Sequence, residues 1–141
     1  MATILLKTEP GEFSFADIER DGRCLWDGVS NAAALIALRQ AREGDEALIY
    51  HTGDEKAIVG LAKVTRGAFE DPANPGVNDK GEPKFAVIEL RAVRRAATPV
   101  SLAEIKADDI FAEFALVKQG RLSAMMVPPA LDKALRKMAG L

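Results

Sequence analysis

The sequence has little of what most enzymes need, with one cysteine, one histidine, one tryptophan and one tyrosine among 141 residues. A single cysteine cannot form a disulfide within the chain, and one cysteine with one histidine makes no metal-ligand cluster. No apolar run approaches the roughly 20 residues of a bilayer-spanning helix, and the first residues lack the basic start of a signal peptide. We therefore expect a reduced, metal-free cytoplasmic protein.

The chain also lacks a basic excess, since 19 Lys and Arg face 21 Asp and Glu for a net charge of −2. Proteins that follow long nucleic-acid backbones usually carry an excess of positive charge, because their affinity comes from phosphate neutralisation. Any contact with a polyanion is therefore expected to be local, around one pocket. The length and the 48% apolar content fit one domain over residues 1–141, which we expect to be a monomer.

Turn and cap residues divide the chain into short strands and short helices. Strands are expected at residues 3–7, 46–51, 57–66 and 85–95, with one more within 116–127. Helices are expected after the N-cap residues Ser14, Asn31 and Ser101, with Gly44 as the left-handed end of the second, and between Pro129 and Gly140. Residues 71–83, rich in proline and charge, predict an irregular excursion. This order predicts an α+β fold with a small, mixed, strongly curved sheet or pseudo-barrel.

The aromatic residues stand at the ends of these elements. Trp26 is followed by the Asp27-Gly28 turn and then by the Asn31 cap, and Tyr50 closes a strand just before a glycine turn. An indole at such a corner can offer its face to a planar ligand, because stacking contributes about 1–3 kcal/mol per base. The alternative is a half-buried ring that bridges core and surface.

Polar residues of two kinds accompany the aromatic ones. Lys7, Thr8 and Glu9 place donors and acceptors at the end of the first strand. Arg121 and Ser123 follow Gly120, and a guanidinium with a hydroxyl suits phosphate oxygens. The alternatives are that Lys7 and Glu9 are only solvated charges and that Arg121 forms a surface ion pair. The run of Arg91, Arg94 and Arg95 is interpreted as a solvated strand face.

Signals for catalysis are weak. The single His51 has no serine or cysteine motif to activate, and Cys24 fits a small buried apolar residue. The chain contains neither a Walker loop nor a dinucleotide-binding glycine motif, so no cofactor is expected.

Six segments, in order, resemble the EVE domain of the PUA-like superfamily, whose relatives include the YTH RNA readers. The segments are Leu6-Lys7-Thr8-Glu9-Pro10 with Phe13-Ser14-Phe15, Trp26-Asp27-Gly28-Val29-Ser30-Asn31, Gly44-Asp45, Tyr50-His51-Thr52-Gly53, Ile58-Val59-Gly60 and Leu116-Val117-Lys118-Gln119-Gly120-Arg121-Leu122-Ser123. They span residues 6–123. Each is weakly specific alone, and the ordered set is strongly specific.

The resemblance implies a PUA-like mixed β pseudo-barrel with short flanking helices, which binds a flipped modified base without catalysis. The partner would be DNA with modified cytosine, or RNA with a modified base. By position, Trp26 would form a wall of the pocket, His51 and Ser123 its edge, and Arg121 a backbone contact. The remaining ligand-binding residues would be Lys7, Thr8, Glu9, Asp27, Gly28, Val29, Asn31 and Tyr50.

The chain departs from this motif at three positions. Ser30 and Leu35 stand where the motif carries arginines, and Ala32 where an aromatic residue is common. These differences predict weak backbone affinity, a narrower ligand such as a free modified nucleoside, or a basic partner domain elsewhere. Two other functions stay open. One is a small-molecule or nucleoside sensor with the same pocket, and the other a nucleotide-processing hydrolase that uses His51 with Glu9.

Overall fold

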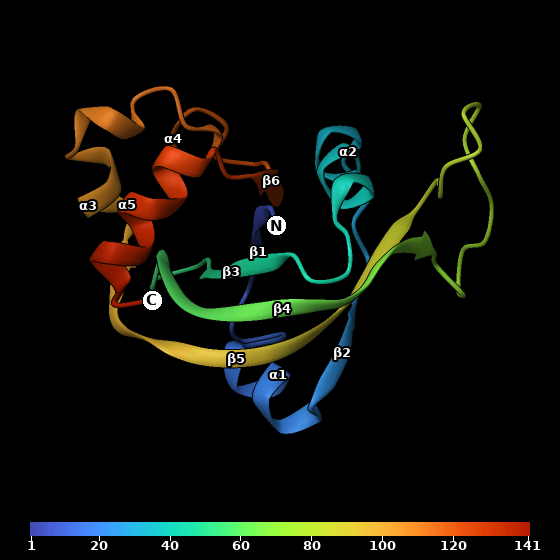
Figure 1. Ribbon diagram of the computed structural model, residues 1–141, viewed down its shortest axis with the longest axis horizontal. Helices are drawn as coiled ribbons and strands as arrows, with labels where there is room; N and C mark the ends of the chain where they lie inside the picture. Colours follow the sequence, from blue (N-terminus) through green and yellow to red (C-terminus); the bar gives the residue numbers. More distant parts are fainter.

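The computed structural model describes residues 1–141 as one six-stranded sheet with short helices around it (Figure 1). The strand order is β2-β5-β4-β3-β1-β6, so β2 and β6 form the open edges. The β1 and β3 strands run parallel, and the other paired strands run antiparallel. The strands are β1 Thr3–Thr8, β2 Arg23–Trp26, β3 Glu46–His51, β4 Ala57–Glu70, β5 Ala86–Ser101 and β6 Ala124–Met126.

The helices begin where the sequence provides side-chain caps. The Ser14 and Ser101 side chains each form a complete capping box, and the Asn31 side chain accepts a hydrogen bond from the backbone N–H of Ala34. The helices α3, α4 and α5 gather at one end of the sheet, whereas α2 stands towards the other end (Figure 1). The helices are α1 Phe15–Asp21, α2 Ala32–Gln40, α3 Leu102–Lys106, α4 Ala115–Lys118, α5 Pro129–Ala139 and the 3₁₀ turn η1 Asp109–Phe111. None of them is both long and apolar enough to cross a bilayer.

Strong curvature comes from the two long central strands, β4 and β5. Their pairing shifts register at four places, and such bulges bend a strand and increase its twist. Gly60 lies at one of these shifts, and its missing side chain leaves room for the ring of Phe15 from α1. The α+β class and the curved pseudo-barrel expected from the sequence are confirmed, with the barrel left open between its edge strands.

The connection between β4 and β5, residues 71–85, projects away from the body as an arm (Figure 1). It contains only two isolated bridges, Asp71 with Asn74 and Val77 with Pro83, so the predicted irregular excursion is confirmed. We call this segment the β4–β5 arm.

One strand was missed, and the bounds expected for three elements were wrong. The strand β2 was not predicted, and β4 and β5 extend beyond their expected ends. Helix α2 ends at Gln40 with Ala41 in an extended conformation, whereas Gly44 (φ +92°) lies in the turn before β3, where its N–H donates to the Val64 carbonyl. The strand expected within 116–127 is confirmed as β6, which follows the short helix α4.

Substitution of Gly60 by alanine should destabilise the fold by about 1–3 kcal/mol, as expected for overpacking a filled core. The new Cβ would stand 2.6 Å from ring atoms of Phe15. The control is Gly120→Ala, whose Cβ would meet no heavy atom within 4 Å. Urea unfolding of both variants measures the difference, and equal stabilities would contradict the close approach of α1 to β4.

Candidate functional site

A pocket of about 320 Å³ lies where the end of β1 faces the end of β2. Three strands separate β1 from β2 in the sheet, so the two ends meet only because the sheet curves round. We call this hollow the seam pocket. Its lining residues are Lys7, Thr8, Phe13, Leu25, Trp26 and Asp27.

Trp26 both packs into the core and lines the seam pocket. Only 7% of the residue is exposed, and it belongs to the main cluster of buried apolar residues. Its ring meets Phe13 edge to face, with the centroids 6.2 Å apart and the planes at 70°. The sequence left two interpretations of Trp26 open, a core residue and a pocket wall. In the structure the Trp26 ring is both.

Lys7 supplies a cation to the seam pocket. Its Nζ donates a hydrogen bond to the Gly120 carbonyl at 3.1 Å and lies 5.7 Å from the centroid of the Tyr50 ring. Burial lowers the pKa of the Lys7 amine from its ordinary value of 10.5, and burial also raises the pKa of the Tyr50 hydroxyl. Tyr50 is itself 3% exposed, so it supports Lys7 instead of lining the seam pocket.

Two polar residues at the end of β1 shape the loop that follows. The Thr8 hydroxyl donates to the Phe13 carbonyl at 2.6 Å, and this bond fixes the segment that carries the Phe13 ring. The exposed Glu9 carboxylate accepts hydrogen bonds from the Gly11 N–H and the Thr52 hydroxyl. Glu9 therefore ties two loops together beside the seam pocket.

Both ring nitrogens of His51 form hydrogen bonds within the chain. Its Nε2 accepts a hydrogen bond from the buried backbone N–H of Phe15 at 3.0 Å, and its Nδ1 lies 2.8 Å from Glu55 Oε1. Because Nε2 is an acceptor, the proton of the neutral ring sits on Nδ1 and is donated to Glu55. Neither nitrogen is free to exchange a proton with a ligand, and the structure gives no support to a hydrolase built on His51 with Glu9.

A second hollow, of about 310 Å³, lies beside the Gly120 turn. Gly120 accepts the Lys7 hydrogen bond, so this turn joins the second hollow to the seam pocket. Arg121 is exposed there and forms no salt bridge, whereas the Ser123 carbonyl accepts the backbone N–H of Lys7. The lining residues are Asn31, Ala33, Gln119, Gly120, Arg121 and Leu122.

The residues predicted for one site are thus divided over several places. Lys7, Thr8, Trp26 and Asp27 meet in the seam pocket, and Asn31 and Arg121 meet in the second hollow. Gly28 and Val29 line a third hollow of about 150 Å³ at the root of the β4–β5 arm. The remaining predicted residues, Glu9, Tyr50, His51 and Ser123, line none of these three hollows.

Sequence reasoning missed two lining residues of the seam pocket. Phe13 has a local signal, because it precedes the Ser14 cap, but that signal predicts packing onto α1 and not contact with Trp26. Leu25 is 42% exposed, and only its position in β2 reveals that it faces outward beside the inward-facing Trp26.

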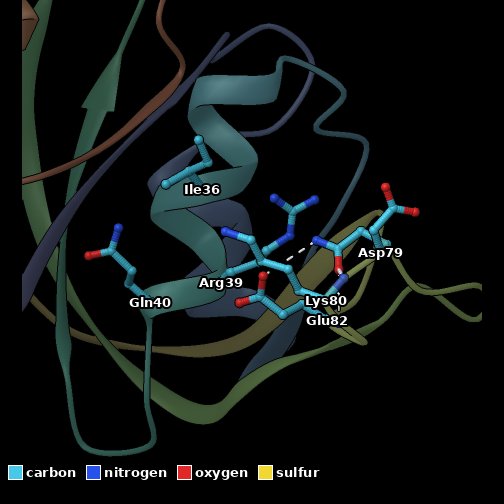
Figure 2. A pocket seen from close by; sticks show the side chains of 7 residues that line it. Ile36, Arg39, Gln40, Asp79, Lys80 and Glu82 are labelled. Atoms are coloured by element: carbon cyan, nitrogen blue, oxygen red, sulfur yellow. Dashed lines mark hydrogen bonds between the residues drawn. The ribbon is translucent and has the colours of Figure 1, made fainter.

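A larger hollow, of about 520 Å³, lies between α2 and the β4–β5 arm (Figure 2). Arg39 of α2 donates hydrogen bonds to the carbonyls of Pro83 and Lys84 and so holds the arm in place. Lys80 and Glu82 project from the arm towards α2 (Figure 2). The lining has charges of both signs and no aromatic ring, so it offers no platform for a base.

Cys24 stays a packing residue in the structure. It is partly buried, and burial together with nearby carboxylates raises the pKa of its thiol to about 11. The thiolate, which is the reactive form, is therefore scarce at neutral pH.

Comparison with known proteins shows the family of the chain. A model of the EVE domain matches residues 3–138. Thymocyte nuclear protein 1 of Homo sapiens is 30% identical over 122 residues, which cover 72% of this chain and 54% of that relative. The chain spans about half the length of the curated relatives it matches.

Solved structures extend the match to the whole fold. An NMR structure of a protein from Rhodopseudomonas palustris is 35% identical with a TM-score of 0.87, over 99% of this chain and 94% of that chain. A crystal structure of human THYN1 protein in complex with 5-methylcytosine-containing DNA is 25% identical with a TM-score of 0.84, over 98% of each chain.

Replacing His51 by alanine should lower the free energy of unfolding by about 1–3 kcal/mol, because the buried N–H of Phe15 loses its acceptor. Glu55→Gln is the control. It keeps an oxygen for the Nδ1–H and should change stability by less than about 1 kcal/mol, since Glu55 is well exposed. Thermal unfolding monitored by circular dichroism compares the two, and an unchanged His51→Ala variant would refute the structural role of the imidazole.

Proposed function

Because the chain belongs to the EVE domain family, we propose that residues 1–141 form one non-enzymatic binding domain for a modified nucleobase in DNA or RNA. The base leaves its stack and enters the seam pocket. The observation that carries this proposal is the combination of an aromatic wall, an apolar lip and charged groups around one pocket of about 320 Å³. Small-molecule sites usually occupy about 300–1,000 Å³ and combine apolar walls with a few polar groups.

The polar groups of the seam pocket match the edge of cytosine better than that of thymine. Asp27 is exposed at the mouth and can accept from the amino group of cytosine, and the Lys7 ammonium can donate to a base carbonyl. A methyl group on the base adds apolar contact with Phe13, Leu25 or Trp26 and gains about 0.8 kcal/mol on burial. We therefore favour a methylated cytosine as the ligand.

Two further observations support this proposal. The human THYN1 protein, which shares the fold, has been crystallised with DNA that contains 5-methylcytosine. The second hollow places the exposed Arg121 close to the seam pocket through Gly120, which favours a nucleotide with phosphate over a free nucleoside. The curated relatives are named as nuclear proteins. For this chain we propose a cytoplasmic location.

Titration of the Trp26 fluorescence with matched oligonucleotides tests the proposal. We expect a single strand with one 5-methylcytosine to bind about fourfold more tightly than its unmodified counterpart, from the burial of one methyl group. Free 5-methylcytidine should bind more weakly than either strand, because it lacks phosphate contacts.

Variants locate the site in the same assay. Lys7→Met removes the charged donor of the seam pocket and should weaken binding of both strands. Gln40→Ala, in the polar hollow beside α2, should leave binding unchanged. Equal affinity for modified and unmodified strands would remove the reader function, and tighter binding of the nucleoside than of the strands would favour the sensor.

A further inference from the structure

Part of the outer face of the sheet carries a row of cations outside the seam pocket. Arg23 of β2 pairs with Arg91 of β5, and Arg91 pairs with Lys63 of β4. Residues paired across strands point to the same face, and neighbouring strands lie about 4.8 Å apart. Arg23 and Arg91 are exposed and Lys63 is half-buried, so three adjacent positive charges border solvent. We call these residues the cation row.

The last helix, α5, covers the residues that follow Lys63 across the same face of the sheet. Lys63 pairs with Glu46 of β3, and Glu46 pairs with Thr3 of β1. The Arg136 guanidinium of α5 donates to both Glu46 and Thr3, at 2.9 and 3.0 Å. Arg136 of α5 therefore neutralises the Glu46 carboxylate at this end of the face. The cation row lies at the other end, with no helix over it.

The arginines that follow on β5 are engaged elsewhere. Arg94 donates to the Leu141 carbonyl at 2.6 Å, and Arg95 forms an ion pair with Glu19 at 2.6 Å. The sequence alone indicates one solvated face for Arg91, Arg94 and Arg95, but in the structure their side chains have different surroundings. Arg91 is the member that faces the uncovered side together with Arg23 and Lys63.

Two carboxylates lie beside the cation row and neutralise it only in part: Glu46, opposite Lys63, is paired with Arg136, and Glu89 lies near Arg23. Glu89 accepts the Thr65 hydroxyl at 2.7 Å and lies 3.6 Å from the Arg23 guanidinium. Arg91 and Lys63 form no salt bridge. Like charges directly opposite one another on neighbouring strands are destabilising, and a bound anion relieves that repulsion.

The cation row is continuous with the seam pocket. Leu25 lines the pocket and shares the outward face with Arg23, two residues away on β2. Two residues of a strand span about 7 Å. Phosphates of a strand whose base enters the pocket would therefore pass close to Arg23 before they pass the other two cations.

We propose that Arg23, Arg91 and Lys63 form a phosphate-binding track for the nucleic-acid strand that flanks the base in the seam pocket. This inference rests on the proposed function and extends it from one base to a length of strand. It also explains how a chain with a net charge of −2 can hold a polyanion, because the charge that matters is local.

The test is the salt dependence of binding to a single strand that contains one 5-methylcytosine. Each lost phosphate contact should lower the slope of log K against log salt concentration by about 0.7. Arg91→Ala should reduce the slope by one such step and weaken binding several-fold at low salt, and Arg91→Ala with Lys63→Ala should reduce it by about two steps. Arg91→Lys keeps the charge and should restore the slope.

The matched control is Arg95→Ala, which removes the same charge from the same strand at a position already paired with Glu19. Its slope should equal that of the unaltered chain. An unchanged slope in the double variant, or an equal loss in Arg95→Ala, would overturn the track. The preference for the modified over the unmodified strand reports separately on the reader function. A lost preference with a reduced slope would reject the reader and retain the track.

Discussion

The edge-to-face contact between Phe13 and Trp26 is the interaction on which the candidate site depends. It joins the loop after β1 to the end of β2, two segments that no backbone hydrogen bond of the sheet connects directly. Curvature of β4 and β5 brings these segments together, and the two rings line the pocket at their junction. The result is an opening with an aromatic wall beside a closely packed core.

The polar and charged side chains of the protein divide into those that hold the fold and those that remain for a ligand. His51, Glu9 and Arg136 are fully engaged in contacts within the chain. Lys7 donates one hydrogen bond to the Gly120 carbonyl, and Arg91 and Lys63 form no salt bridge. A protein without a basic excess can in this way still present positive charge locally to a polyanion.

The sequence predicted the fold well wherever the signal is local. The caps at Ser14, Asn31 and Ser101 were predictable because each bonds within three residues along the chain. The short strand β2 was not, because its four residues become a strand only through pairing with β5. For the candidate site, Trp26 and Lys7 were predicted from their positions at element ends, and the structure places both at the seam pocket. The roles of Tyr50 and His51 were not legible, because burial there depends on contacts far apart in sequence.

Chemical-shift mapping of the backbone amides during titration with a strand containing one 5-methylcytosine tests the central claim most directly. The account predicts the largest shifts at Lys7, Thr8, Phe13 and residues 25–27, with little change at Ile36, Arg39 and residues 78–82. Shifts concentrated on the second group, in the hollow between α2 and the β4–β5 arm, would contradict it.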